Sequence, residues 1–422
     1  MGKSRTAQAN IQYSGVNFST SMNQVSSFEY VDAASGEGDT ISLSVSDKER
    51  KWIGAWYPQK GDRLTADIMV NDWEREGDRA ALYCGSFVLD SISFSGFPIV
   101  GSIGGISIPA DTDFKSTKRT RIWQSITVEQ VGREIAWNAG FDLNYEATEI
   151  WISTLEQSSQ GDCEFLFALC KSYGLAMKIF NGRIVIYDEA VYEARDAVIT
   201  IDASDMISLD DYNSSLDGTY TGGTITYTDP NTEEEITVNV GTVRSSNSSA
   251  ANVTAKSKTD MYVRSTSSTS GKAYGVIPSG TTVAVIEELE NGWLKIQYEK
   301  APEGIAYTSN RGGNYYTIDK TQTQSSSVDV GPRCLEINEK ADNTYDAELK
   351  AVAAVNQANK TAVTMKIKIM ANLKIIATSN VLITGLEKLN GKYAVDKVTH
   401  SVGSGYTMSL ELRLIQGRLS AR

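Results

Sequence analysis

The chain contains one histidine, His400, and this residue limits the catalytic chemistry that the sequence could support. A Ser-His-Asp or Cys-His mechanism needs a histidine as its base, so either would have to use His400. The residue lies in the strand-like run Lys392–Ser401, beside the glycine pair Gly403 and Gly405. We therefore expect a structural or interface role for His400 and no catalytic residue.

The cysteines and carboxylates do not form a recognisable metal or catalytic group. Zinc sites use three or four closely spaced His, Cys or carboxylate ligands, and we expect no metal and no cofactor. Four scattered cysteines, without a CxxC pair, predict buried reduced thiols in a protein made in a reducing compartment: Cys84, Cys163, Cys170 and Cys334. The acidic pair Asp210-Asp211 has the residue types of a paired-carboxylate glycosidase, but a solvated turn is the preferred interpretation.

Composition favours a multidomain protein without specific nucleic-acid binding or membrane insertion. Its 422 residues predict about three domains. The net charge of −12, without a basic run, argues against specific nucleic-acid binding. The longest apolar runs, such as Gly101–Ala110, fall short of the roughly 20 residues that cross a bilayer, and no secretory signal is visible.

The pattern along the chain predicts β structure around an α+β middle region. The first ~110 residues alternate apolar and polar side chains, as in Thr40–Val45, which indicates a barrel or sandwich. Helices are predicted to begin at a capping box of Thr127 with Gln130 and to cover about Gly161–Tyr173. Asn181-Gly182 is typical of a hairpin turn. A third helix, Tyr345–Asn359, precedes further strands up to Leu414.

The segment Met261–Asn310 has the pattern of a small closed barrel inserted between two polar linkers. Five short strand-like runs alternate there with turn sequences such as Asn291-Gly292. Five aromatic residues are candidates for a groove that binds a peptide, a cell-wall glycopeptide or a partner protein: Tyr262, Tyr274, Trp293, Tyr298 and Tyr307. The alternative is that they divide between the barrel core and scattered surface positions.

Several motifs together resemble the phage late control D family, the baseplate hub proteins of contractile tails and tail-like bacteriocins. The motifs are Trp56–Asp62, Lys115–Trp123, Gln157–Leu166 and Gly391–His400, in this order along the chain. The insert separately resembles bacterial SH3-like domains in Val263-Arg264, Pro278–Val283 and Asn291–Ile296. It departs from them at Ile305-Ala306-Tyr307, where the usual sequence is Gly-Tyr-Val.

The resemblance implies a mainly β fold with an α+β middle domain, two hub-type β-barrels and an inserted small SH3-like barrel. The expected boundaries are residues 1–112 for the first barrel and 113–197 for the middle domain. Residues 198–241 with 331–422 form the second, discontinuous barrel. The SH3-like barrel covers residues 259–312, between linkers 242–258 and 313–330. In the family, three subunits form a ring with pseudo-sixfold symmetry between a sixfold tail tube and a threefold spike.

The function implied is that of a non-enzymatic baseplate hub of a phage tail or tail-like bacteriocin of a Gram-positive host. The expected partners are two further copies of the chain, the tail tube protein, the spike protein, other baseplate proteins and, through the insert, peptidoglycan. The protein would be made in the bacterial cytoplasm and become part of the virion or released particle. The alternative is a peptidoglycan hydrolase or cell-wall-binding protein targeted by its SH3-like domain.

Overall fold

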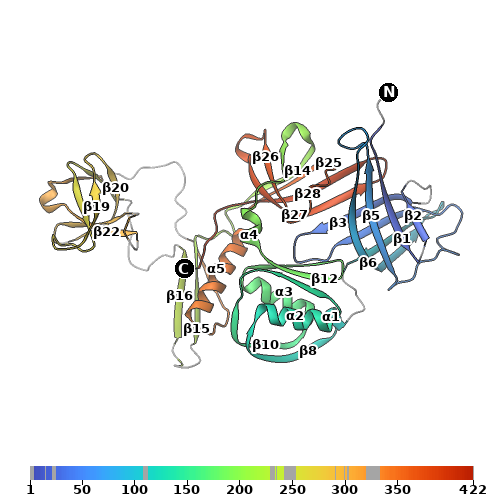
Figure 1. The fold of residues 1–422 in the computed structure, drawn as a ribbon, viewed down its shortest axis with the longest axis horizontal. Coiled ribbons are helices and arrows are strands. Elements are labelled where there is room, and N and C mark those ends of the chain that lie inside the picture. Colours follow the sequence, from blue (N-terminus) through green and yellow to red (C-terminus); the bar gives the residue numbers. More distant parts are fainter. Residues whose placement is uncertain are drawn as a thin grey trace. The chain divides into compact units, whose positions relative to one another are not determined.

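The computed structural model describes eleven stretches of the chain: residues 4–14, 16–20, 25–107, 113–228, 233, 235–241, 253–289, 291–298, 300–301, 304–319 and 333–421. The chain divides into two compact units, Met1–Val243 with Pro332–Arg422 and Arg244–Gly331. Most of the described residues that lie in helices or strands lie in strands, so the mainly β fold predicted from the sequence is confirmed (Figure 1). Within the described residues, no helix is both long and apolar enough to cross a bilayer.

The N-terminal lobe is an antiparallel sheet whose strands alternate buried apolar and solvent-facing polar side chains. In β4 the residues Ile41, Leu43 and Val45 are buried and the serines between them are half-buried, as the period-2 pattern predicts. Its strands are β1 (Thr6–Tyr13), β2 (Val16–Ser19), β3 (Val25–Ala33), β4 (Thr40–Ser46), β5 (Arg63–Asn71), β6 (Arg79–Ser95) and β7 (Val100–Ile106).

The C-terminal lobe joins the N-terminal lobe in one sheet, although the two are far apart in sequence. Strand β27 pairs with β3, with His400 opposite Tyr30, so the described strands of both lobes form a 13-stranded sheet around one apolar core. The C-terminal strands are β13 (Ile199–Asp202), β14 (Met206–Ser214), β25 (Val363–Met370), β26 (Asn380–Thr384), β27 (Gly391–Val402) and β28 (Tyr406–Leu414). Asp210 and Asp211, expected in a turn, instead lie in β14, where both are solvent-exposed.

The middle region is α+β, as predicted, and has its own apolar core. The capping box forms, with Gln130 N donating to Thr127 Oγ1 and Thr127 N to Gln130 Oε1. Asn181 and Gly182 both have positive φ in the turn between β11 and β12, which confirms the predicted hairpin. The elements are α1 (Asp113–Ser116), β8 (Lys118–Thr127), α2 (Val128–Asn138), β9 (Asp142–Glu146), β10 (Trp151–Gly161), α3 (Asp162–Ser172), β11 (Leu175–Phe180), β12 (Arg183–Asp188) and α4 (Glu189–Ala194).

Part of the range expected for the second barrel, residues 198–241 and 331–422, forms a separate three-stranded sheet. This sheet is β15 (Gly222–Thr228), β16 (Glu235–Gly241) and β24 (Cys334–Ile337), and it packs on α5 (Thr344–Asn359). The strands leave the large sheet because Ile225 and Val240 bury their side chains against the helix face that carries Ala351 and Val355. Close packing is supported by Gly223, where a Cβ would lie 2.7 Å from Val355.

The insert is a small β-barrel with its own core. It consists of β17 (Val253–Ser257), β18 (Met261–Arg264), β19 (Ala273–Ile277), β20 (Thr282–Glu288), β21 (Trp293–Gln297), β22 (Ile305–Ser309) and β23 (Tyr316–Asp319). Strands β17 and β23 pair with each other inside both ranges expected to be linkers, because Ala255 and Tyr316 are buried in this core. Residues 242–252 and 320–330 of those linkers lie outside the described residues. Three single 3₁₀ turns complete the described helices: η1 (Ala203–Asp205), η2 (Arg311–Gly313) and η3 (Glu387–Leu389).

Candidate functional site

Three of the five aromatic residues predicted to form a groove lie on one face of the insert. The neighbouring strands β18, β22 and β21 each direct a side chain into the barrel core: Val263, Ala306 and Leu294. Successive side chains of a strand point to opposite faces, so the flanking Tyr262, Tyr307 and Trp293 belong to the outer face. Tyr262 is 60 % exposed, Tyr307 is half-buried, and Trp293 is buried, with 5 % of its surface exposed.

The other two aromatic residues serve the barrel interior. Tyr274 and Tyr298 are half-buried and pack against the core cluster of the insert. The hydroxyl of Tyr298 lies over Gly275, where a Cβ would come within 2.2 Å of the oxygen. The structure therefore divides the five aromatics between core and surface, and a ligand groove remains a prediction for Tyr262, Trp293 and Tyr307.

Two cations on the same outer face were not among the residues predicted from the sequence. Arg264 and Lys295 are the cross-strand neighbours of Tyr307 on its two sides. The guanidinium carbon of Arg264 lies 5.4 Å from the centre of the Tyr262 ring, a cation–π distance. The alternation in Tyr262-Val263-Arg264 and in Trp293-Leu294-Lys295 could have shown that each cation points to the same side of its strand as the preceding aromatic residue. That the two runs share one face of the barrel follows only from the strand order.

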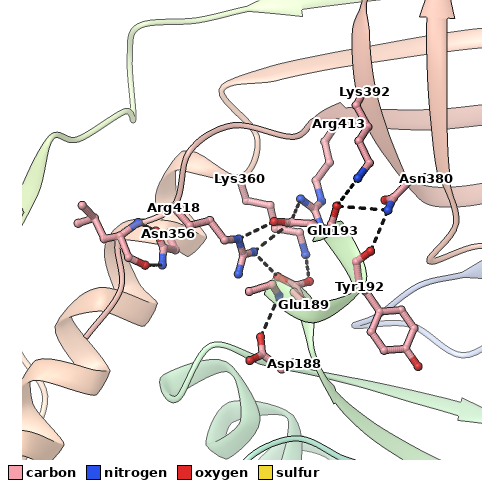
Figure 2. A network of polar contacts seen from close by, with 12 residues as sticks. Asp188, Glu189, Tyr192, Glu193, Asn356, Lys360, Asn380, Lys392, Arg413 and Arg418 are labelled. Carbon is pink, nitrogen blue, oxygen red and sulfur yellow. Dashed lines mark hydrogen bonds and ion pairs between the residues drawn. The ribbon is translucent and has the colours of Figure 1, made fainter. Parts of the chain in front are cut away.

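A second polar site lies where α4 meets the C-terminal lobe (Figure 2). Glu189 and Glu193 are four residues apart on α4 and therefore share one helix face, and both are buried. Arg418 contacts both carboxylates, at 3.1 Å from Glu189 and 2.7 Å from Glu193. Glu189 also pairs with Lys360, and Glu193 with Arg413. These ion pairs thus connect the short helix α4 with residues that lie more than 160 positions further along the chain.

Further contacts close this network around the C-terminal end of α4. Asn380 Nδ2 donates to the carbonyl oxygens of Tyr192 and Arg195, both at 2.8 Å. The Tyr192 carbonyl also accepts from the backbone N–H of Arg195, so Asn380 adds a second hydrogen bond there. Arg413 Nε lies 2.8 Å from Asp396 Oδ1. Burial alone would raise the pKa of Glu189, but nearby Lys360 and Arg413 hold it below its ordinary value. Glu189 is therefore ionised at neutral pH.

A cavity beside this network is too small for a substrate. Its volume is about 20 Å³, and Tyr192, Asn380, Asp396 and Arg413 are among the residues that line it. Among the described residues, Asn380 Oδ1 is buried without a hydrogen-bond partner. A cavity of this size has room for about one water molecule. The cavity is therefore large enough for a single water molecule but not for a substrate.

His400 is part of the apolar core of the large sheet. It has no exposed surface, its Nδ1 lies 2.7 Å from the Tyr406 hydroxyl, and its ring stacks on Tyr30. Burial lowers its pKa to about 4, so the imidazole is neutral at pH 7. The thiols of Cys163 and Cys170 are also buried, which raises their pKa to about 11 and about 12. Cys334 differs from the expectation because it is half-buried.

Comparison with known proteins identifies the insert and the fold. Residues 259–311 match the bacterial SH3 domain family. None of the curated proteins matches the chain in sequence. The tail protein from Neisseria meningitidis MC58 has a similar structure, with a TM-score of 0.57, 9 % identity and 96 % coverage of each chain. The 43 kDa tail protein of prophage MuSo2 from Shewanella oneidensis has a TM-score of 0.57 and 10 % identity, covering 96 % of this chain and 98 % of its own.

The chain therefore has the fold of phage tail proteins and carries a bacterial SH3 domain between two strands of that fold. At this level of identity the likeness is one of fold. The similarity to tail proteins, first indicated by the sequence motifs, is confirmed at the level of the fold.

Proposed function

We propose that the chain is the baseplate hub of a contractile injection particle, either a phage tail or a tail-like bacteriocin. The observation that carries the proposal is the 13-stranded sheet, which joins an N-terminal and a C-terminal β lobe through β3 and β27. A chain with two such lobes contributes two sheet segments to a ring, so three copies supply six. The likeness of fold to solved tail proteins, over 96 % of this chain, supports the same role.

The proposed mechanism is mechanical. Three copies form a ring that binds the tail tube protein on one side and the spike protein on the other, and that adapts sixfold to threefold symmetry. The ring transmits the force of sheath contraction along the axis and becomes part of the virion or released particle. A non-enzymatic role is supported by the burial of the one histidine, because a base without exposed surface does not reach a substrate.

Copy number in the particle tests the proposed ring. Purified particles, or the chain co-expressed with its spike protein, are analysed by native mass spectrometry. A central assembly with three times the 46.0 kDa chain mass is expected. A central assembly of one or six copies would contradict the threefold adapter.

The insert is proposed to be an accessory domain that contacts peptidoglycan or other baseplate proteins. Its two connections leave the tail-protein fold at one place, since Gly241 of β16 and Cys334 of β24 both lie opposite Gly222 of the central strand β15. Two strand spacings separate them, roughly 10 Å. About four extended residues, at ~3.3 Å each, span this distance. The small sheet is thus able to close without the insert.

Replacing residues 242–333 by a four- to six-residue Gly/Ser link tests this role. Particles with the deleted chain are expected to assemble with normal morphology in electron micrographs, because no described strand of the large sheet is removed. A particle that carries an unrelated small domain at the same position is the control for the connection itself. Loss of assembly in the deletion alone would make the insert part of the structural ring. A zymogram with the purified protein tests the alternative of a peptidoglycan hydrolase.

A further inference from the structure

The outer face of the insert combines aromatic rings with two positive charges. We define the cationic aromatic face as Tyr262, Arg264, Lys295 and Tyr307; Trp293 lies on the same side of its strand but is buried. Tyr307 lies between Arg264 and Lys295 in the cross-strand register, so the two cations are two strands apart, roughly 10 Å. One Arg264 nitrogen, Nη1, donates to the Gly271 carbonyl at 2.9 Å. A guanidinium has five N–H donors, which leaves further donors for a ligand.

The charge of the chain is unevenly divided between the insert and the rest. Residues 244–331 contain nine Lys or Arg and eight Asp or Glu, whereas the whole chain has a net charge of −12. The acidic excess therefore lies outside the insert. A polyanion is repelled by the tail-protein fold and meets a favourable potential at the cationic aromatic face.

We propose that the cationic aromatic face binds an acidic polysaccharide whose sugars carry carboxylates. A sugar ring lies against Tyr307, and carboxylates on neighbouring sugars contact Arg264 and Lys295. Arginine is the side chain best suited to bind a carboxylate, since its planar guanidinium group donates two parallel hydrogen bonds. The proposal rests on the proposed function only in that an injection particle meets a cell surface.

The two cations are not equivalent. Glu287 of β20 is the cross-strand neighbour of Lys295 on the side away from Tyr307, and it offsets part of the lysine's charge. Arg264 has no acidic residue opposite it in the described register, where its neighbours are Ala273 and Tyr307. Removing the charge of Arg264 should therefore weaken binding more than removing that of Lys295.

Binding of the full-length protein to polygalacturonate, measured by biolayer interferometry, tests the proposal. Neutral dextran and double-stranded DNA of similar length are the comparison polymers. We expect binding to polygalacturonate that weakens with added salt, and no binding to dextran or DNA. The double variant R264Q/K295Q should lose at least about tenfold in affinity, with R264Q alone causing most of the loss. The matched control K256Q/K300Q removes the same charge from two other exposed lysines of the insert and should change affinity less than twofold.

Three results would overturn the proposal: no binding to polygalacturonate, equal loss in both double variants, or DNA binding as tight as that of the acidic glycan. Equal thermal unfolding temperatures of the variants show that the insert stays folded. These outcomes are separate from the test of the hub role, because assembly of particles with a deleted insert does not depend on glycan binding.

Discussion

The buried ion network around α4 makes a prediction about stability that depends on the tertiary contacts. Replacing Glu193 by Gln keeps the size of the side chain and removes its negative charge. Glu193 faces Arg413 and Arg418, whose side chains are 8 % and 22 % exposed. Both arginines then remain in a poorly solvated site with one carboxylate fewer.

The expected loss in the free energy of unfolding follows from what each arginine retains. Removing one partner of a buried ion pair costs about 3–5 kcal/mol. Arg413 keeps Asp396 at 2.8 Å, and Arg418 keeps Glu189 at 3.1 Å. The amide oxygen of Gln still accepts a hydrogen bond. We therefore expect the lower end of the range, about 3 kcal/mol.

Urea unfolding followed by tryptophan fluorescence measures this change. Six of the seven tryptophans lie outside the insert, so the fluorescence reports mainly on the unit that contains α4. E129Q is the matched control, because Glu129 pairs with the largely exposed Arg133 on α2 and its loss should cost only about 0.5 kcal/mol. If E193Q and E129Q destabilise the protein equally, the network does not stabilise the fold as argued.

Three further predictions concern other parts of the same unit. Burial gives folded His400 a pKa of about 4, below the ordinary value of 6.5, so only the unfolded chain takes up this proton between these pH values. This residue's contribution to stability is complete above pH 6.5 and should decline by up to about 3 kcal/mol as the pH falls to 4. Unfolding free energies of H400Q across this range should lack that decline, and parallel profiles would contradict the assignment. T127A removes half of the capping box and should lower the free energy of unfolding by about 1 kcal/mol, measured by urea unfolding. T148A, on exposed surface, serves as its reference. W123A should cost about 3–5 kcal/mol because the ring is buried against Phe165, and W137A, 83 % exposed, should stay within about 0.5 kcal/mol; similar losses for both would show that burial is not the cause.

Local patterns in the sequence predicted the elements that depend on near neighbours. The capping box at Thr127 and the hairpin turn at Asn181-Gly182 formed as expected, because their hydrogen bonds and positive φ angles involve residues only a few positions apart. The alternation in β4 gave its buried face for the same reason. The barrel of the insert was also visible, since its short strands and turns follow one another along the chain.

Contacts between distant segments were decided only by the tertiary structure. The pairing of β3 with β27 joins residues more than 360 positions apart, and no local pattern specifies such a register. Strands β15, β16 and β24 have the same alternation as barrel strands, but they pack on α5 because an apolar face is buried wherever a complementary surface lies. The aromatic residues of the insert are a second example. Their residue type indicated that they could contact a ligand, but only the strand order determined which of them share a surface with Arg264 and Lys295. The sequence by itself thus determined the β elements, the helix start and the inserted barrel, while the fold alone determined which faces meet, since side-chain burial depends on neighbours that the chain supplies from afar.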